Sequence, residues 1–100
     1  MSELQYNRIW NRVFGRAGNP PEEFPKAVDA MLADMEAGKI RIGATANVNT
    51  TLHLTRFREY FSNSNTLEKV SKTLGVSKDV IRFSIVQIEG QLMRHMKEYL

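Results

Sequence analysis

The stretch from Thr66 to Arg82, TLEKVSKTLGVSKDVIR, decides the fold that this sequence predicts. Within it and just after it, apolar residues recur at helical spacing on both sides of Gly75: Leu67, Val70, Leu74, Val80, Ile81 and Ile85. Glycine ends a helix readily because it adopts the left-handed conformation without a Cβ clash. Ser77 is a residue type that begins a helix as its N-cap. We therefore predict two helices joined by a short glycine turn, with Val76 buried in the turn.

Three parts of this stretch, Thr66–Val70, Leu74–Ser77 and Ile81-Arg82, resemble the helix-turn-helix in region four of bacterial sigma factors and related regulators. The resemblance covers only about a fifth to a third of the chain. It implies that the second helix enters the major groove of DNA with its N-terminal residues nearest the bases. On that basis the expected base contacts are Ser77, Lys78, Asp79 and Arg82, and the expected phosphate contacts are Lys69 and Lys72.

Beyond Arg82 the helical pattern continues to about Tyr99, interrupted only by Gly90. One side of this long segment is apolar through Ile81, Ile85, Ile88, Leu92, Met96 and Tyr99. A second apolar side consists of Phe83, Val86, Gly90 and Met93. A helix that is apolar on two sides is either central in its fold or buried against a partner. We therefore predict a partner interface, or the contact of a homodimer, at Phe83, Val86, Leu92, Met93 and Met96.

Several residues of this segment are not of the types expected in a helix that contacts DNA bases. Phe83 and Val86 occupy its outer flank, where a reading helix normally carries polar residues, and Asp79 would repel phosphate. Gly90 is less favourable than alanine by about 1 kcal/mol, which a close helix approach or a bend would explain. Exposure of Phe83 and Val86 beside Lys78 and Arg82 would mark this flank as an interaction surface. Their burial would favour DNA reading.

Two further helices are predicted at the N-terminal end. The first covers residues 3–16, and its arginines recur every fourth residue, so that Arg8, Arg12 and Arg16 form one basic stripe beside the apolar side. Residues 18–21 form a turn, since they include two prolines. The second helix runs from about Glu22 or Lys26 to Ala37.

Residues 39–54 allow two interpretations. Apolar residues alternate with others at positions 40, 42, 52 and 54, which fits a short strand or a hairpin. Leu54, Phe57 and Phe61 instead follow helical spacing, and we favour a helix over residues 50–62. The prediction is thus one all-α domain of four or five helices. Its parts are an N-terminal helix pair in 1–38, a connector and helix in 39–64, and the helix-turn-helix-like segment with a long C-terminal helix in 65–100.

The composition narrows the classes of function. The chain has 100 residues, of which 42% are hydrophobic and 25% charged, as in a single globular domain. It has no cysteine, so disulfides, thiolate nucleophiles and cysteine-bound metals are excluded. His53 and His95 lack a carboxylate at metal-ligand spacing, and no catalytic triad can be assembled. We expect no enzyme, metal, cofactor or small-molecule substrate. No apolar run is long enough for a membrane and no secretory signal is present, so we expect a cytoplasmic protein.

The charge pattern points to a binding function. The net charge of +3 conceals +2 in residues 1–16, −4 in residues 17–38 and +5 in residues 39–100. A basic C-terminal region favours a DNA-binding transcriptional regulator that uses the helix-turn-helix, with dimerisation through the long helix. The alternative is a protein–protein interaction module, for example a phage- or plasmid-encoded inhibitor of the anti-CRISPR kind that binds a nucleoprotein complex. Such an inhibitor could use the arginine stripe, or the acidic residues 22–36 as a phosphate mimic.

Overall fold

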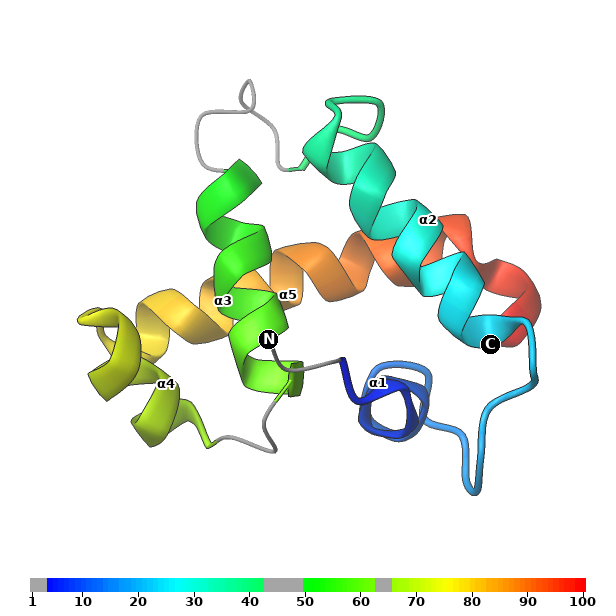
Figure 1. Cartoon of the computed structure of the whole chain (residues 1–100), viewed down its shortest axis with the longest axis horizontal. Helices are drawn as coiled ribbons and strands as arrows, with labels where there is room; N and C mark the ends of the chain where they lie inside the picture. Colours follow the sequence, from blue (N-terminus) through cyan, green and yellow to red (C-terminus); the bar gives the residue numbers. More distant parts are fainter. Residues whose placement is uncertain (1–3, 43–49, 63–65) are drawn as a thin grey trace.

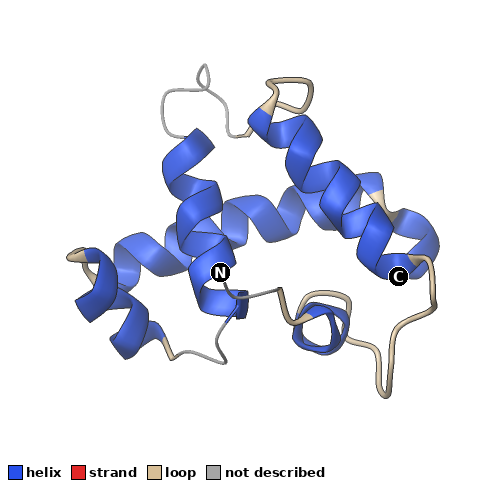
Figure 2. Cartoon of the chain, viewed as in Figure 1, coloured by secondary structure: helices blue, strands red, loops and turns tan. Residues whose placement is uncertain are grey.

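The computed structural model describes residues 4–42, 50–62 and 66–100, and this part of the chain is helical without a strand (Figures 1 and 2). The all-α prediction is therefore confirmed. In chain order the elements are α1 (Tyr6–Arg12), α2 (Phe24–Glu36), α3 (Thr50–Ser62), α4 (Leu67–Leu74), α5 (Lys78–His95) and the short 3₁₀ helix η1 (Lys97–Tyr99).

The long helix α5 organises the packing. In Figure 1 it runs along the length of the molecule, with α3 and α4 against its N-terminal half and α2 against its C-terminal half. The helix α1 packs on α3, near the end of α3 that leads to α4. The elements α3, α4 and α5 are in mutual contact and form a three-helix unit. The N-terminal helix pair thus packs against this three-helix unit and does not form a separate layer.

The inner side of α5 forms the centre of the core. Ile81, Ile88 and Leu92 are fully buried, and Ile85 and Met96 are at most 6% exposed. The predicted apolar side is therefore confirmed for these five residues, whereas Tyr99 lies in η1 and is half-buried. The prediction that Leu92 and Met96 belong to a partner interface is wrong, because both lie on this inner side and α2 packs against the same half of α5. Periodicity shows that a helix side is apolar, but it does not show which element covers it.

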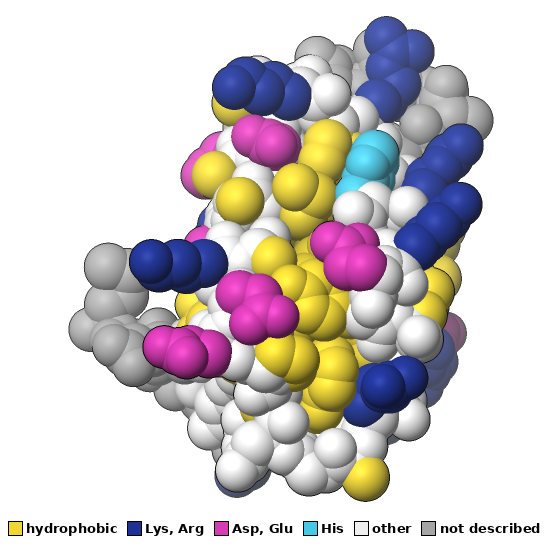
Figure 3. Space-filling view, turned by 90° about the vertical axis from the view of Figure 1, so that its right-hand side faces the viewer, with side chains coloured by type: hydrophobic (Ala, Val, Ile, Leu, Met, Phe, Trp, Pro, Cys, Tyr) yellow, Lys and Arg dark blue, Asp and Glu magenta, His cyan; other side chains and the backbone are white. Residues whose placement is uncertain are grey.

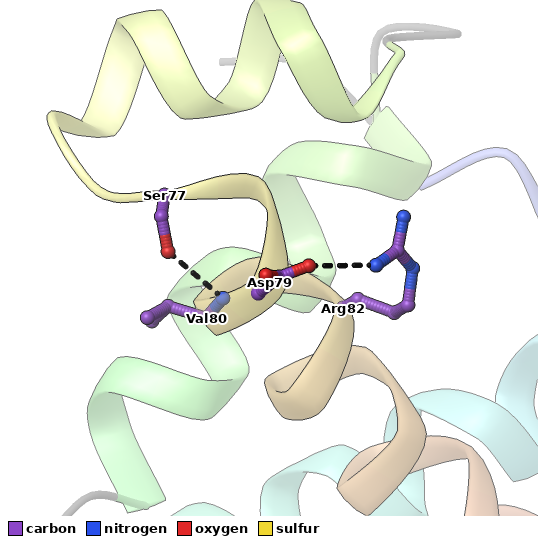
Figure 4. Close-up of polar contacts among 4 residues, drawn as sticks. All are labelled: Ser77, Asp79, Val80 and Arg82. Atoms are coloured by element: carbon purple, nitrogen blue, oxygen red, sulfur yellow. Dashed lines mark hydrogen bonds and ion pairs between the residues drawn. The ribbon is translucent and has the colours of Figure 1, made fainter.

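The glycine turn between α4 and α5 is built from local interactions. The hydroxyl of Thr66 accepts the backbone N–H of Lys69 at 3.2 Å and caps α4. Gly75 ends α4 with φ of 70°, the left-handed conformation expected of a helix-terminating glycine. The hydroxyl of Ser77 then accepts the backbone N–H of Val80 at 3.2 Å and caps α5 (Figure 4). The predicted pair of helices around a glycine turn is confirmed, although Val76 is only half-buried.

Two predicted elements have different limits. The first helix ends at Arg12, because the chain turns after Val13: the N–H of Arg16 bonds to the carbonyl of Trp10 at 3.2 Å, and Gly15 adopts φ of 65°. Arg16 therefore does not continue a helical stripe. The long helix ends at His95, and η1 follows it.

The alternative of a strand or hairpin near 39–54 is not supported by the residues that can be assessed. Residues 39–42 form no strand, and residues 50–54 belong to α3. Residues 43–49 lie outside the described part of the chain. Leu54, Phe57 and Phe61 are all buried on the inner side of α3. Their helical spacing was the reason to favour a helix over residues 50–62, and that prediction is confirmed.

Candidate functional site

A groove of about 660 Å³ opens where α1, the end of α3 and the N-terminal ends of α4 and α5 meet. We call it the basic groove, because four cationic side chains and one carboxylate line it. Its lining residues are Arg8, Arg12, Tyr60, Thr66, Leu67, Glu68, Lys78 and Arg82. A hollow of this size and charge suits an extended anion better than an apolar ligand.

The basic groove joins two sets of residues that the sequence analysis treats separately. Arg8 and Arg12 come from the predicted arginine stripe, and Lys78 and Arg82 come from the predicted DNA-binding helix. They are more than sixty positions apart in the chain. They meet because α1 packs on α3, which in turn packs on α4 and α5. Tertiary packing thus produces one cationic site from two cationic segments.

Tyr60 positions both arginines of α1. Nη1 of Arg8 donates to the backbone carbonyl of Tyr60 at 2.6 Å, and its guanidinium carbon lies 4.8 Å from the centre of the Tyr60 ring and 5.2 Å from that of Phe61. Nη1 of Arg12 donates to the Tyr60 hydroxyl at 2.7 Å. Burial is the main cause that lowers the pKa of Arg8 below its ordinary value, but a guanidinium in a protein stays charged at neutral pH. The cations at this wall of the groove are therefore held in fixed positions.

The opposite wall carries an exposed ion pair. Nη1 of Arg82 donates to a carboxylate oxygen of Asp79 at 2.9 Å, one helical turn away (Figure 4). The side chain of Arg82 is 59% exposed and that of Asp79 is 91% exposed, so water and salt screen the pair strongly. An anion in the groove could replace Asp79 as the partner of Arg82.

Not every predicted contact residue belongs to the groove. Lys69 and Lys72 are exposed on α4 but are not among its lining residues. The hydroxyl of Ser77 serves as the cap of α5. The guanidinium of Arg16 lies over the ring of Trp10, 5.6 Å from its centre, and Arg16 is also outside the lining. Of the basic residues predicted as DNA contacts or as the arginine stripe, Arg8, Arg12, Lys78 and Arg82 line the groove.

A second hollow, of about 380 Å³, continues from the basic groove along α5. It shares Arg12, Tyr60, Leu67 and Arg82 with the groove and adds Phe61, Ile85, Val86 and Glu89. Burial raises the pKa of the Glu89 carboxyl. Neither Glu89 nor Tyr60 was among the site residues predicted from the sequence. The spacing of Glu89, two turns after Arg82, could have indicated the former, whereas Tyr60 joins the site only through the packing of α1 on α3.

The outer side of α5 is apolar and exposed. Phe83 is 59% exposed, Val86 is 53% exposed, and Met93 further along is half-buried. The ring of Phe83 makes an edge contact with His53, with 5.9 Å between ring centres. Phe83 and Val86 are thus exposed on the helix that carries Lys78 and Arg82, which is the arrangement expected of an interaction surface.

The two histidines have unrelated surroundings. Nδ1 of His53 is 2.7 Å from the hydroxyl of the fully buried Ser84, and Nη1 of Arg56 donates to the same oxygen at 3.0 Å. Burial and then the charge of Arg56 lower the pKa of His53. His95 is exposed in the last turn of α5. Within the described ranges, no group of three His, Asp or Glu side chains is placed to hold a metal ion.

The acidic segment lies on a different face. Figure 3 shows the side of the molecule formed by α2 and the C-terminal end of α5, where acidic side chains are scattered along a band of hydrophobic ones. One of the carboxylates of α2, that of Asp29, accepts the hydroxyl of Tyr6 at 2.6 Å.

The chain matches no protein-family model, no curated protein and no solved structure. Of the helices in the described ranges, none combines the length and the apolar character that crossing a bilayer requires.

Proposed function

We propose that the protein is a small, non-enzymatic DNA-binding regulator of the cytoplasm that holds the DNA backbone in the basic groove of its helix-turn-helix unit. The observation that carries this proposal is the convergence of Arg8 and Arg12 of α1 with Lys78 and Arg82 of α5 around one groove. Like charges repel one another, and Glu68 is the one carboxylate beside four cations in the lining, so a bound anion would stabilise this arrangement.

Duplex DNA fits the chemistry of the basic groove. Its backbone carries about one negative charge per 1.7 Å of helix axis, and arginine binds phosphate oxygens in a bidentate manner. Tyr60 holds two of the arginines in place, so less conformational entropy is lost when phosphate binds. Four phosphate contacts predict that the logarithm of the binding constant falls with the logarithm of salt concentration at a slope of about −3.6.

The exposed apolar side of α5 changes the role expected of this helix. Lys78 and Arg82 line the groove on the flank of α5, whereas Phe83 and Val86 occupy its outer side. We therefore assign Lys78 and Arg82 to phosphates and not to base edges. On this proposal, affinity for DNA depends only weakly on its sequence.

A salt titration of binding to mixed-sequence duplex DNA, followed by fluorescence anisotropy, tests the proposal. The double variant Arg12→Ala/Lys78→Ala should bind weakly and show a slope reduced by about two. The matched control is Lys69→Ala/Lys72→Ala, which loses the same charge outside the groove. Absence of binding at low salt, or equal losses in the two double variants, would refute the proposal.

A second function, as a protein-interaction module that acts on a nucleoprotein complex, is favoured by the exposure of Phe83 and Val86. In that case Phe83→Glu should abolish the action of the protein on the nucleoprotein complex, while Arg12→Ala/Lys78→Ala should retain it. The opposite pattern would favour the DNA-binding function.

A further inference from the structure

The outer side of α5 carries a regular apolar row, which we call the seam: Phe83, Val86, Gly90 and Met93. Its members are separated by three, four and three residues, the spacing that brings side chains to one edge of a helix in a two-helix coiled coil. Phe83 and Val86 are more than half exposed, and Met93 is half-buried. The seam thus has the pattern of a helix–helix contact but remains open in the described chain.

Gly90 has no evident role inside the chain. It lies within α5, where glycine is less favourable than alanine by about 1 kcal/mol. Its φ is not among the positive values found at Gly15, Gly18, Gly38 and Gly75, so the backbone does not require glycine there. A Cβ placed on Gly90 would meet no atom within 4 Å outside its two chain neighbours and the adjacent backbone of its own helix, so internal packing does not require glycine either. A contact from outside, at which another helix comes close, would give this glycine a physical reason.

We propose that the seam is the interface of a homodimer in which the α5 helices of two copies cross in antiparallel directions. A two-fold axis places the same surface on both sides, so the surface must be complementary to itself. The seam has this property: when Val86 of one copy faces Gly90 of the other, Phe83 of one copy faces Met93 of the other. Val86 then occupies the space left by the missing side chain, and a thioether packs against an aromatic ring.

Charges at the two ends of the seam favour the antiparallel direction. Asp79 lies four residues before Phe83, the first member of the seam, and its side chain is 91% exposed. Arg94 is exposed beside the other end, and Lys97 follows in η1. In the antiparallel register that pairs Val86 with Gly90, each Asp79 lies opposite Lys97 of the other copy, whereas in a parallel pair the two Asp79 side chains would face each other. The antiparallel direction also aligns the two helix macrodipoles favourably.

This inference does not rest on the proposed DNA binding. Val86 belongs to the seam and also lines the second hollow, which shares Arg82 with the basic groove, so the seam and the groove occupy neighbouring sides of α5. A dimer formed through the seam would carry two basic grooves on one particle.

Sedimentation equilibrium over a series of protein concentrations tests the interface. The mass of the wild-type chain should rise from 11.5 kDa toward twice that value as concentration increases. Gly90→Leu and Phe83→Glu should each weaken association at least tenfold, and circular dichroism should show unchanged helix content, because both positions are exposed in the single chain. Leu100→Glu is the matched control, since Leu100 is 54% exposed but lies off the seam, and it should associate like the wild type.

A charge exchange tests the direction of crossing. Asp79→Lys alone should weaken association, and addition of Lys97→Glu should restore it. A wild-type mass that stays at 11.5 kDa up to the solubility limit would overturn the inference, whatever the result with DNA. A dimer that persists in both Gly90→Leu and Phe83→Glu would also overturn it. A dimer that does not bind DNA would refute only the proposed function.

Discussion

Replacement of Asp79 by asparagine should strengthen DNA binding while it slightly weakens the fold. The carboxylate of Asp79 forms an ion pair with Arg82, with 2.9 Å between Oδ1 and Nη1, and Arg82 lines the basic groove. A phosphate that enters the groove must therefore compete with this carboxylate. The amide of asparagine retains the size of the side chain but removes its charge, so Arg82 becomes available to phosphate.

The size of the effect follows from the geometry of the ion pair. Two unit charges 2.9 Å apart interact by about 1.4 kcal/mol in bulk water. Exposed pairs retain only about 0.2–1 kcal/mol after screening and loss of side-chain entropy. We therefore expect a gain in binding of up to about fivefold in Kd at low salt, and a smaller gain at high salt. The unfolding free energy should fall by about 0.3–1 kcal/mol, because Asp79 lies in the first turn of α5, where a carboxylate interacts favourably with the helix macrodipole.

Fluorescence anisotropy with a labelled duplex measures the change in Kd, and urea unfolding measures the change in stability. The matched control is Glu36→Gln, which removes an exposed negative charge on α2, outside the groove lining. Repetition in the Gly90→Leu background removes any contribution from a change in association. An equal gain from Glu36→Gln would show a general charge effect. Unchanged or weaker binding with intact helix content would refute the competition between Asp79 and phosphate.

Gly75→Ala should lower the unfolding free energy by about 1–2 kcal/mol in urea titrations, because Gly75 has φ of 70°; an unchanged midpoint would contradict this reasoning. Burial and Arg56 lower the pKa of His53 in the folded state, so protons bind preferentially to the unfolded chain. Stability should therefore decrease as the pH falls through about 6.5 toward the lower folded-state pKa, and His53→Asn should flatten that part of the stability profile. Tyr60→Phe removes the hydroxyl that accepts the bond from Arg12, so it should weaken DNA binding a few-fold without changing helix content; an affinity equal to that of wild type would show that Arg12 needs no such support.

Local features of the fold could be predicted from the sequence. The capping hydroxyl of Ser77 and the left-handed Gly75 act within a few residues of their own position, so their effects can be read from neighbouring residues. The inner side of α5 was predicted for the same reason, since helical periodicity places Ile81, Ile88 and Leu92 on one side. The prediction was wrong where an element distant in the sequence covers a side of the helix. Leu92 and Met96 were assigned to a partner interface, but α2 covers that half of α5.

The sequence by itself determined that this chain is all-α, that its fourth and fifth helices join at a glycine turn, and that its net charge is positive. Only the tertiary structure decided which cations act together. Arg8 and Arg12 meet Lys78 and Arg82 because α1 packs on α3, whereas Arg16 is separated from them by the turn of the chain after Val13. The physical reason is range: hydrogen bonds at caps and turns connect residues a few positions apart, while burial of apolar surface is non-directional and joins any segments whose faces fit.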